Sequence, residues 1–248
     1  MSSENSGERN DRAKTRGSRR IKRVAFAFDL EGTLVDLEKF HQLAFEHVAQ
    51  TLGVRFGREE FHAFVGAGYD AISKEIARLG AEAQLRLDPK QIREAVLRVY
   101  RDILHSHPIE PREGVAEYLE KSATIGGDLV LASLTVDSDA QKILKESKLG
   151  PFFKHVLTET SVQEKKPHPQ IYLEAARRRR VKNKNLVVHE DSPPGIQSAK
   201  AAGSPAIAFP VHEGLKFEPQ PDAIYLSWKD VNPFDVIERL FPTKRKEK

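Results

Sequence analysis

Short apolar runs alternate with amphipathic stretches over the second half of the chain. Short runs bounded by turn residues indicate buried strands, whereas apolar positions three and four residues apart indicate helices. The predicted strands after residue 112 are Asp128–Ala132, His155–Thr158, Asn185–His189, Pro205–Val211 and Ala223–Trp228. The predicted helices are Glu113–Ser122, Ser138–Ser147, His168–Arg180, Pro193–Ala202 and Phe234–Phe241.

This alternation determines the fold class. Strands separated by helices pair in parallel, and the helices cover both faces of the sheet. The chain is therefore predicted to be an α/β protein with a Rossmann-like parallel sheet as its core. Ligands of such sheets bind beyond the carboxyl ends of the strands, so the side chains that follow each strand are the first candidates for a site.

The first predicted strand, Val24–Phe28, does not follow the same rhythm. The next segment, Leu37 to His107, has helical periodicity and no convincing strand. One predicted helix face in it contains Phe40, Leu43, Ala44, His47 and Val48, and another contains Ile92, Val96, Val99 and Ile103. A helical cap inserted into the core explains this pattern. We expect residues 37–108 to form the cap, and residues 23–36 with 109–242 to form the core.

The positive charge of the chain lies at its two ends. The formal net charge is +4, but residues 1–23 contain eight Lys/Arg and three Asp/Glu, and residues 243–248 contain four Lys/Arg and one Glu. Residues 24–242 are left with −4. Because both ends are polar, residues 1–22 and 243–248 are predicted to be disordered basic tails. Solvated tails are favoured over nucleic-acid or membrane binding.

The composition excludes several classes of protein. The 248 residues, 39% of them hydrophobic, suffice for one large domain or for a core with an inserted subdomain. No apolar run is long enough to span a membrane, and the N-terminus lacks the apolar stretch of a secretory signal. Cysteine is absent, which removes disulfides, thiol nucleophiles and cysteine metal sites. We expect a soluble cytoplasmic protein that is a monomer or a weak homodimer.

Polar residues follow four of the predicted strands. They are Asp29 with Glu31, Ser133, Lys166, and Glu190 with Asp191. A carboxylate beside a buried strand is unfavourable unless it is paired, hydrogen-bonded or bound to a metal. Carboxylates suit Mg²⁺, which usually shares its ligand shell with a substrate phosphate. Lysine and serine can hold the same phosphate, and Asp29 lies where an aspartate could attack phosphorus.

Four motifs together resemble a known family. They are FDLEGTLVD (28–36), LASLT (131–135), KKPHPQIY (165–172) and HEDSPPGIQSAKAAG (189–203). In their order and spacing, residues 23–240 resemble the haloacid dehalogenase superfamily of phosphohydrolases, in the branch with a helical cap after the first motif. The similar members are β-phosphoglucomutase, phosphoglycolate phosphatase and the sugar-phosphate phosphatases.

The resemblance implies a role for each site residue. Asp29 would be the nucleophile that becomes aspartyl phosphate, and Glu31 the acid/base. Mg²⁺ would be held by Asp29, the backbone carbonyl of Glu31, Glu190 and Asp191. Ser133 and Lys166 would hold the transferring phosphoryl group, and Thr33 would brace the loop. His41 would lie near the acid/base, and Leu134, where the family usually has a small residue, would narrow the pocket.

Several of these residues have a structural alternative. Ser133 could be an ordinary strand-end hydroxyl, and Asp191 could cap the helix that begins at Pro193. For His41, packing is favoured over a substrate role. The run Arg177–Arg180 is predicted to be a solvated helix end, where cations suit the helix dipole.

The predicted function is that of a magnesium-dependent phosphatase acting on a small phosphorylated metabolite. The alternatives are a phosphosugar mutase of the β-phosphoglucomutase type and a catalytically weakened homologue that binds a phosphometabolite. Glu31 is unusual because this position is normally aspartate in the family. The extra methylene moves its carboxylate about 1.5 Å outward. We expect this displacement to slow hydrolysis of the phosphoenzyme more than its formation.

Overall fold

The computed structural model of the chain describes residues 24–64 and 68–242. Within them, parallel strands form one sheet in the order β3-β2-β1-β4-β5-β6. The strands are β1 Ala25–Phe28, β2 Leu129–Ala132, β3 Phe153–Leu157, β4 Leu186–Glu190, β5 Ala206–Ala208 and β6 Ala223–Ile224. The predicted tails, 1–22 and 243–248, lie outside the described residues.

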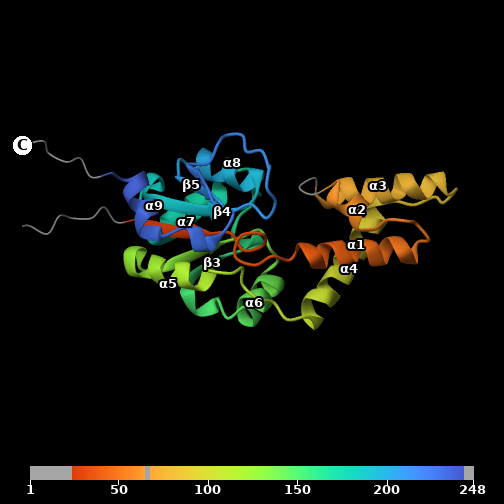
Figure 1. The fold of residues 1–248 in the computed structure, drawn as a ribbon, viewed down its shortest axis with the longest axis horizontal. Helices are drawn as coiled ribbons and strands as arrows, with labels where there is room; N and C mark the ends of the chain where they lie inside the picture. The colour runs from red at the N-terminus through yellow and green to blue at the C-terminus, as the bar shows by residue number, and fades with distance from the viewer. Residues whose placement is uncertain (1–23, 65–67, 243–248) are drawn as a thin grey trace, which may run out of the picture.

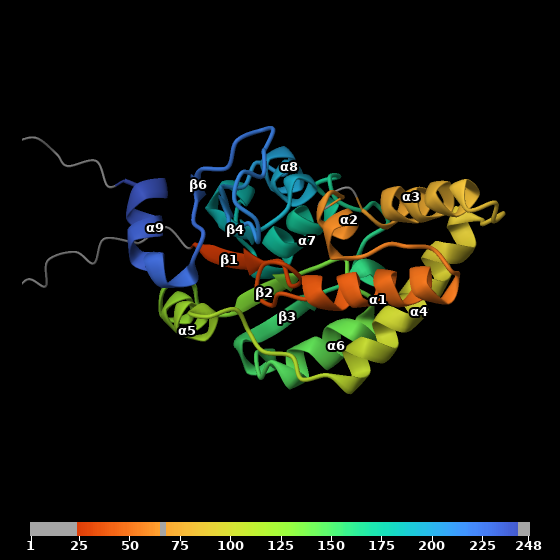
Figure 2. The same ribbon diagram turned by 45° about the vertical axis from the view of Figure 1, so that its right-hand side comes forward.

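Helices follow every strand except β5 (Figures 1 and 2). Those of the core are α5 Val115–Gly126, α6 Asp137–Glu146, α7 Gln170–Arg179, α8 Pro193–Ala201 and α9 Pro233–Leu240. Between β1 and β2 come α1 Glu38–Thr51, α2 Arg58–His62, α3 Tyr69–Glu82 and α4 Pro89–Ser106, which we call the cap helices. They gather at one end of the molecule, away from α9 (Figure 1). The predicted α/β class with an inserted helical cap is confirmed.

The sheet has two different faces. Phe26 and Phe28 of β1 join a large aromatic and aliphatic cluster that includes Tyr118 of α5. Ala25 and Ala27 point to the opposite face, where alanines predominate against α7 and α8. Side chains alternate along a strand, so the sequence AFAF places small residues on one face and rings on the other.

The buried face of α4 differs in detail from its predicted face. Ile92, Val96, Tyr100 and Leu104 are buried, at a regular spacing of four residues. Val99 and Ile103 are only partly buried beside them. On α1, His47 is exposed, although it was predicted to share the apolar face. The polar hydroxyl of Tyr100 is the important addition, since it brings a hydrogen-bond donor into an otherwise apolar face.

Two further predictions were wrong at the margins of the core. The strand predicted over Ala223–Trp228 ends at Ile224, and the buried Trp228 instead begins a short 3-10 helix. Of the run Arg177–Arg180, which was predicted to be solvated, Arg177, Arg178 and Arg180 are exposed, but Arg179 is not. Its guanidinium is buried and donates to Asp128 Oδ2 at 3.1 Å and to the Gly126 carbonyl at 2.9 Å.

The helices were also compared with the length of a bilayer span. No helix within residues 24–64 and 68–242 is long and apolar enough to cross a membrane.

Candidate active site

Three carboxylates meet at the carboxyl ends of the central strands β1 and β4. Phe28 pairs with His189 across these strands, and the Asp29 N–H donates to the His189 carbonyl at 3.0 Å. Asp29 therefore lies beside Glu190 and Asp191, and one oxygen from each of the three falls within 4.8 Å of the others. The sheet brings together acids that are about 160 residues apart in sequence, as predicted from the strand ends.

Lys166 lies among these acids. Its ammonium donates to Asp29 Oδ1, lies 2.6 Å from Glu190 Oε1 and donates to the Ala132 carbonyl at 3.1 Å. The side chain is only 7% exposed, whereas its neighbour Lys165 is exposed and lies 3.6 Å from Glu159. A buried ammonium is stable only when it is paired, so Lys166 is fixed by the acids that surround it.

Glu190 is held from two further directions. Its Oε1 accepts from the Tyr172 hydroxyl at 2.5 Å, and its Oε2 accepts from the Ser192 hydroxyl at 3.0 Å. A Cβ added to Gly195 would lie 1.9 Å from the Glu190 carboxyl carbon. Only glycine therefore allows α8 to begin this close to the carboxylate.

The predicted capping role of Asp191 is wrong. The N-cap of α8 is Ser192, whose Oγ accepts from the Gly195 N–H at 3.2 Å. Asp191 instead points toward the loop after β1, where the Thr33 hydroxyl donates to its Oδ1 at 3.0 Å. Its carboxylate is thus turned toward Asp29 rather than toward the helix.

The loop after β1 is fastened to the rest of the core. Gly32 has a φ of +79°, and a Cβ there would lie 2.1 Å from Asp191 Oδ2. The Arg112 guanidinium donates to the carbonyls of Gly32 and Phe209, at 2.5 and 2.6 Å. The Trp228 indole donates to the Thr33 carbonyl at 3.1 Å. These contacts support the predicted bracing of the loop and add two residues to it.

The carboxylates are crowded enough to alter their protonation. Burial raises the pKa of Asp29 to about 7, and the charge of Glu190 adds to this while Lys166 opposes it. Burial and the charges of Glu190 and Asp29 raise the pKa of Asp191 well above its usual range. One lysine thus does not compensate three acids. The unbalanced charge and the oxygen-only donor set fit a hard divalent cation such as Mg²⁺.

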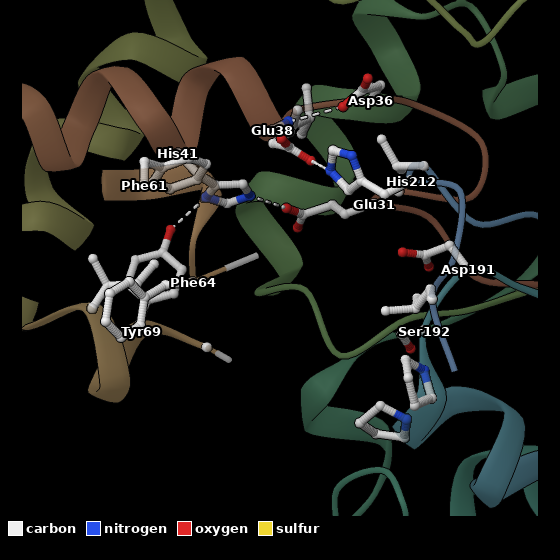
Figure 3. A pocket seen from close by; sticks show the side chains of 18 of the residues that line it. Glu31, Asp36, Glu38, His41, Phe61, Phe64, Tyr69, Asp191, Ser192 and His212 are labelled. Atoms are coloured by element: carbon white, nitrogen blue, oxygen red, sulfur yellow. Dashed lines mark hydrogen bonds and ion pairs between the residues drawn. The ribbon is translucent and has the colours of Figure 1, made fainter. Parts of the chain in front are cut away.

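The carboxylate of Glu31 points away from this cluster, toward the cap helices (Figure 3). Its Oε1 accepts from the Thr135 hydroxyl at 2.6 Å, and its Oε2 accepts from the Tyr100 hydroxyl at 2.9 Å. The Nε2 of His41 lies 3.5 Å from the same Oε2. Burial alone would raise the pKa of Glu31, but the hydrogen bonds from His41, Thr135 and Tyr100 outweigh it and lower that pKa.

His41 is itself fixed by two tyrosines. Its ring stacks on the Tyr100 ring with centroids 4.3 Å apart, and its Nδ1 is hydrogen-bonded to the Tyr69 hydroxyl at 2.5 Å. The side chain therefore packs within the cap and also reaches Glu31. The packing of His41 and its place near Glu31 agree with the sequence interpretation, and a substrate role stays a prediction.

The other two predicted substrate residues lie in the loop after β2. The Ser133 hydroxyl is buried and bonds to the Thr135 hydroxyl at 2.9 Å, which links it indirectly to Glu31. Leu134 packs against the alanine-rich face of the sheet. Leu134 does not line the cavity between the cap helices and the core that is described below, so its narrowing of the pocket stays a prediction.

Four residues that hydrogen-bond to the site carboxylates were missed in the sequence. Thr135, Tyr172 and Ser192 lie inside three of the quoted motifs without an assigned site role, and Tyr100 lies in the cap. The spacing of Ile92, Val96 and Tyr100 places the tyrosine on the buried face of α4. A tyrosine on such a face needs a hydrogen-bond partner, and this signal was available from the sequence.

A cavity of about 350 Å³ lies between the cap helices and the core. Glu31, Gly32 and Asp191 form part of its wall, and His41 and Tyr69 line the side of the cap (Figure 3). The candidate active site therefore opens into a space large enough for a small molecule.

The motifs and their geometry agree with a comparison against protein families. The family model described as haloacid dehalogenase-like hydrolase matches residues 26–209, about three quarters of the chain. The chain belongs to this family. The family resemblance of the motifs is confirmed, and together with the phosphatase-named relatives given next it makes the chain a phosphoric monoester hydrolase.

Several curated relatives of this haloacid dehalogenase-like hydrolase are named phosphatases, and another is named β-phosphoglucomutase. It is 29% identical over 189 residues to a phosphorylated carbohydrates phosphatase from Thermotoga maritima, covering 76% of this chain and 85% of the relative. It is 28% identical over 231 residues to a phosphoglycolate phosphatase from Neisseria meningitidis, covering 90% and 96%.

Solved structures agree with the fold. CbbY from Rhodobacter sphaeroides in complex with xylulose-(1,5)-bisphosphate superposes with a TM-score of 0.64 at 25% identity, covering 82% of this chain and 94% of that one. A predicted phosphoglycolate phosphatase from Haemophilus somnus gives a TM-score of 0.72 at 21% identity, covering 86% and 96%. The second likeness shows the fold alone.

Proposed function

We propose that this protein is a magnesium-dependent phosphatase that removes phosphate from a small phosphorylated metabolite through an aspartyl phosphate on Asp29. The observation that carries the proposal is the meeting of Asp29, Glu190, Asp191 and Lys166 at one sheet edge. The relatives named as phosphatases of phosphorylated carbohydrates and of phosphoglycolate support the substrate class.

The acids would hold Mg²⁺, with the Glu31 backbone carbonyl as a further ligand. Mg²⁺ in this place would reduce the repulsion between the carboxylates and an anionic phosphate. Glu190 also has a second role, because its hydrogen bonds from Tyr172 and Ser192 keep it turned toward Lys166. Lys166 and Ser133 would hold oxygens of the phosphoryl group, and Lys166 would keep Asp29 oriented.

In the first step, a carboxylate oxygen of Asp29 attacks phosphorus and the bond from phosphorus to the ester oxygen breaks. Glu31 gives a proton to that leaving oxygen. In the second step, Glu31 takes a proton from a water molecule as the water attacks phosphorus. Inorganic phosphate leaves and the Asp29 carboxylate is restored.

Glu31 is the candidate for both proton transfers, and its lowered pKa favours the ionised form that acts as the base in the second step. Its carboxylate is fixed by Thr135, Tyr100 and His41 at the mouth of the cavity. These partners reach the longer side chain of a glutamate, which supports glutamate as the acid/base of this protein rather than a weakened aspartate.

The proposal is tested by phosphate release and by trapping of the phosphoenzyme. The wild-type protein should release phosphate from acetyl phosphate with Mg²⁺ and should lose this activity in EDTA. Acid quenching during turnover should yield a phosphorylated peptide that contains Asp29. Asp29→Asn should lower turnover by at least about 10³-fold and yield no such peptide.

The matched control is Asp235→Asn, which removes an exposed carboxylate from α9. It should keep wild-type turnover and phosphopeptide. Wild-type activity of Asp29→Asn, or full activity in EDTA, would refute the covalent, magnesium-dependent mechanism.

A further inference from the structure

The cavity between the cap helices and the core has a mainly apolar wall. Phe45, Phe61, Phe64 and Ile72 line it on the cap side, and Val211 and Leu215 line it from the loop after β5. Its volume of about 350 Å³ exceeds what a phosphoryl group alone would fill. The remaining space would surround the organic part of a phosphate ester.

The charged groups of this cavity are acidic. No lysine or arginine of the described residues lines it, because Lys166 lies buried behind the carboxylates. Asp36 and Glu38, at the start of α1, both line the wall. The Asp36 carboxylate accepts the Glu38 N–H at 3.0 Å, which fixes it beside the helix.

The two histidines near this wall, His62 and His212, already pair with the Glu38 carboxylate. The Nε2 of His212 pairs with Glu38 Oε2 (Figure 3), and the Nδ1 of His62 lies 3.6 Å from Glu38 Oε1. On the opposite side of the cavity, His41 likewise pairs with the Glu31 carboxylate. A second anionic group on a substrate would therefore find no unmatched cation among these residues.

We propose that the organic part of the substrate is uncharged, carries an apolar or aromatic face and bears no phosphate or carboxylate besides the phosphate that is removed. This inference rests on the proposed function and narrows its substrate class to esters without a carboxylate, which leaves out phosphoglycolate, the substrate in the name of one relative. A second anion would lose hydration and meet Asp36 and Glu38 without a counter-ion. An apolar face would be buried against Phe61, Phe64 and Leu215.

The same walls disfavour the mutase reaction. A phosphosugar mutase must hold a second phosphate while the first is transferred, and that phosphate needs a cation. In the described part of the cavity, the charged side chains beyond the phosphate site are the carboxylates of Asp36 and Glu38. The inference therefore separates a phosphatase of apolar monophosphates from an enzyme that works on bisphosphates.

A matched pair of esters tests the inference. Benzyl phosphate and 4-carboxybenzyl phosphate differ by one carboxylate, and acetyl phosphate serves as a reference with little organic part. With Mg²⁺, kcat/KM for benzyl phosphate should exceed that for 4-carboxybenzyl phosphate by at least about tenfold. Glucose 1,6-bisphosphate should be a poorer substrate than benzyl phosphate.

Variants of Glu38 and Phe64 show whether these cavity residues cause the preference for benzyl phosphate. Glu38→Gln should narrow the ratio between the two benzyl esters severalfold, because one repelling carboxylate is removed. Phe64→Ala should lower kcat/KM for benzyl phosphate about tenfold more than for acetyl phosphate, and Phe64→Leu should lower it less. Phe234→Ala, which truncates a 51% exposed phenylalanine on α9, should leave both ratios at the wild-type value.

The outcomes separate this inference from the proposed function. If none of the esters is hydrolysed, the proposed function fails and the inference fails with it. If acetyl phosphate is hydrolysed but 4-carboxybenzyl phosphate is cleaved as well as benzyl phosphate, the inference alone is wrong. It is also wrong if Phe64→Ala affects benzyl phosphate and acetyl phosphate equally.

Discussion

The metal-ligand candidates and Glu31 lie at the same sheet edge, but their neighbours come from different parts of the chain. Asp29, Glu190 and Asp191 contact Lys166, Tyr172, Ser192 and Thr33, all of which belong to the core. Glu31 has one core donor, Thr135, and two neighbours from the cap, Tyr100 and His41.

The difference assigns separate tasks to the two parts. The core alone can form the site for the nucleophile and the metal, because every contact there lies within the sheet and its loops. Glu31 is held in its observed position by α1 and α4 as well as by the core. We therefore expect changes in the cap to affect the geometry of proton transfer more than the groups that hold the phosphate.

The largest expected effect comes from removing the Lys166 ammonium, which pairs with the acids of the core. Lys166→Met should lower turnover by about 10³-fold, since Asp29 and Glu190 lose their shared ammonium. Removing one partner of a buried ion pair also destabilises the fold by about 3–5 kcal/mol, and Mg²⁺ should restore part of this. Phosphate release and thermal unfolding with and without Mg²⁺ measure both effects.

Lys165→Met is the matched control for this variant. Lys165 is the preceding residue but is exposed, with one weak ion pair to Glu159. Its replacement should change turnover less than about twofold. Similar losses in the two variants would mean that the position of the ammonium within the cluster is unimportant.

The second test concerns Glu31. Glu31→Gln should reduce turnover by about 10²–10⁴-fold, the usual range for general acid–base catalysis. Glu31→Asp should reduce it by about 10²-fold, because a carboxylate misplaced by about 1 Å loses its position and Tyr100 and Thr135 contact the longer side chain. Steady-state kinetics and rapid mixing with p-nitrophenyl phosphate distinguish the two steps.

The same measurements can favour the expectation drawn from the sequence. If glutamate is a handicap, wild-type protein should show a burst of p-nitrophenolate and Glu31→Asp should turn over faster. The arrangement of Glu31 in the structure predicts the opposite order. A burst together with a faster aspartate variant would therefore show that the contacts with Tyr100 and Thr135 do not serve catalysis.

The smallest expected effect comes from removing the hydrogen bond that the cap residue Tyr100 donates to Glu31. Tyr100→Phe should lower kcat about tenfold with little change in KM, since one of several hydrogen bonds to a charged group is lost. In a Glu31→Gln background, Tyr100→Phe should have almost no further effect. An equal loss in both backgrounds would show that Tyr100 acts through packing of the cap rather than through Glu31.

Much of the core could be predicted because its signals are local. The apolar runs place five of the six strands to within a few residues, and each motif follows its strand directly. The site residues Asp29, Lys166 and Asp191 converge because parallel strands all end at the same edge. These predictions required no knowledge of how distant side chains pack.

The errors occur where distant packing decides the outcome. Arg179 was expected in solvent, yet it reaches Asp128 and the end of α5, which lie far away in sequence. The edge strand β6 pairs with β5 over two residues only, so its apolar continuation to Trp228 was available to cover Phe28 and Tyr118 instead. The contact of Tyr100 with Glu31 likewise depends on how α4 crosses the core.

Trp228 gives the loop after β1 an optical reporter. It is the only tryptophan in the chain, its ring stacks on Phe209 with centroids 3.5 Å apart, and its indole N–H is bonded to the backbone of Thr33. When it is excited selectively, emission from this single tryptophan senses the strength of that hydrogen bond and the burial of the ring. Displacement of the loop that carries Asp29 and Glu31 would therefore alter the intrinsic fluorescence of the unlabelled protein.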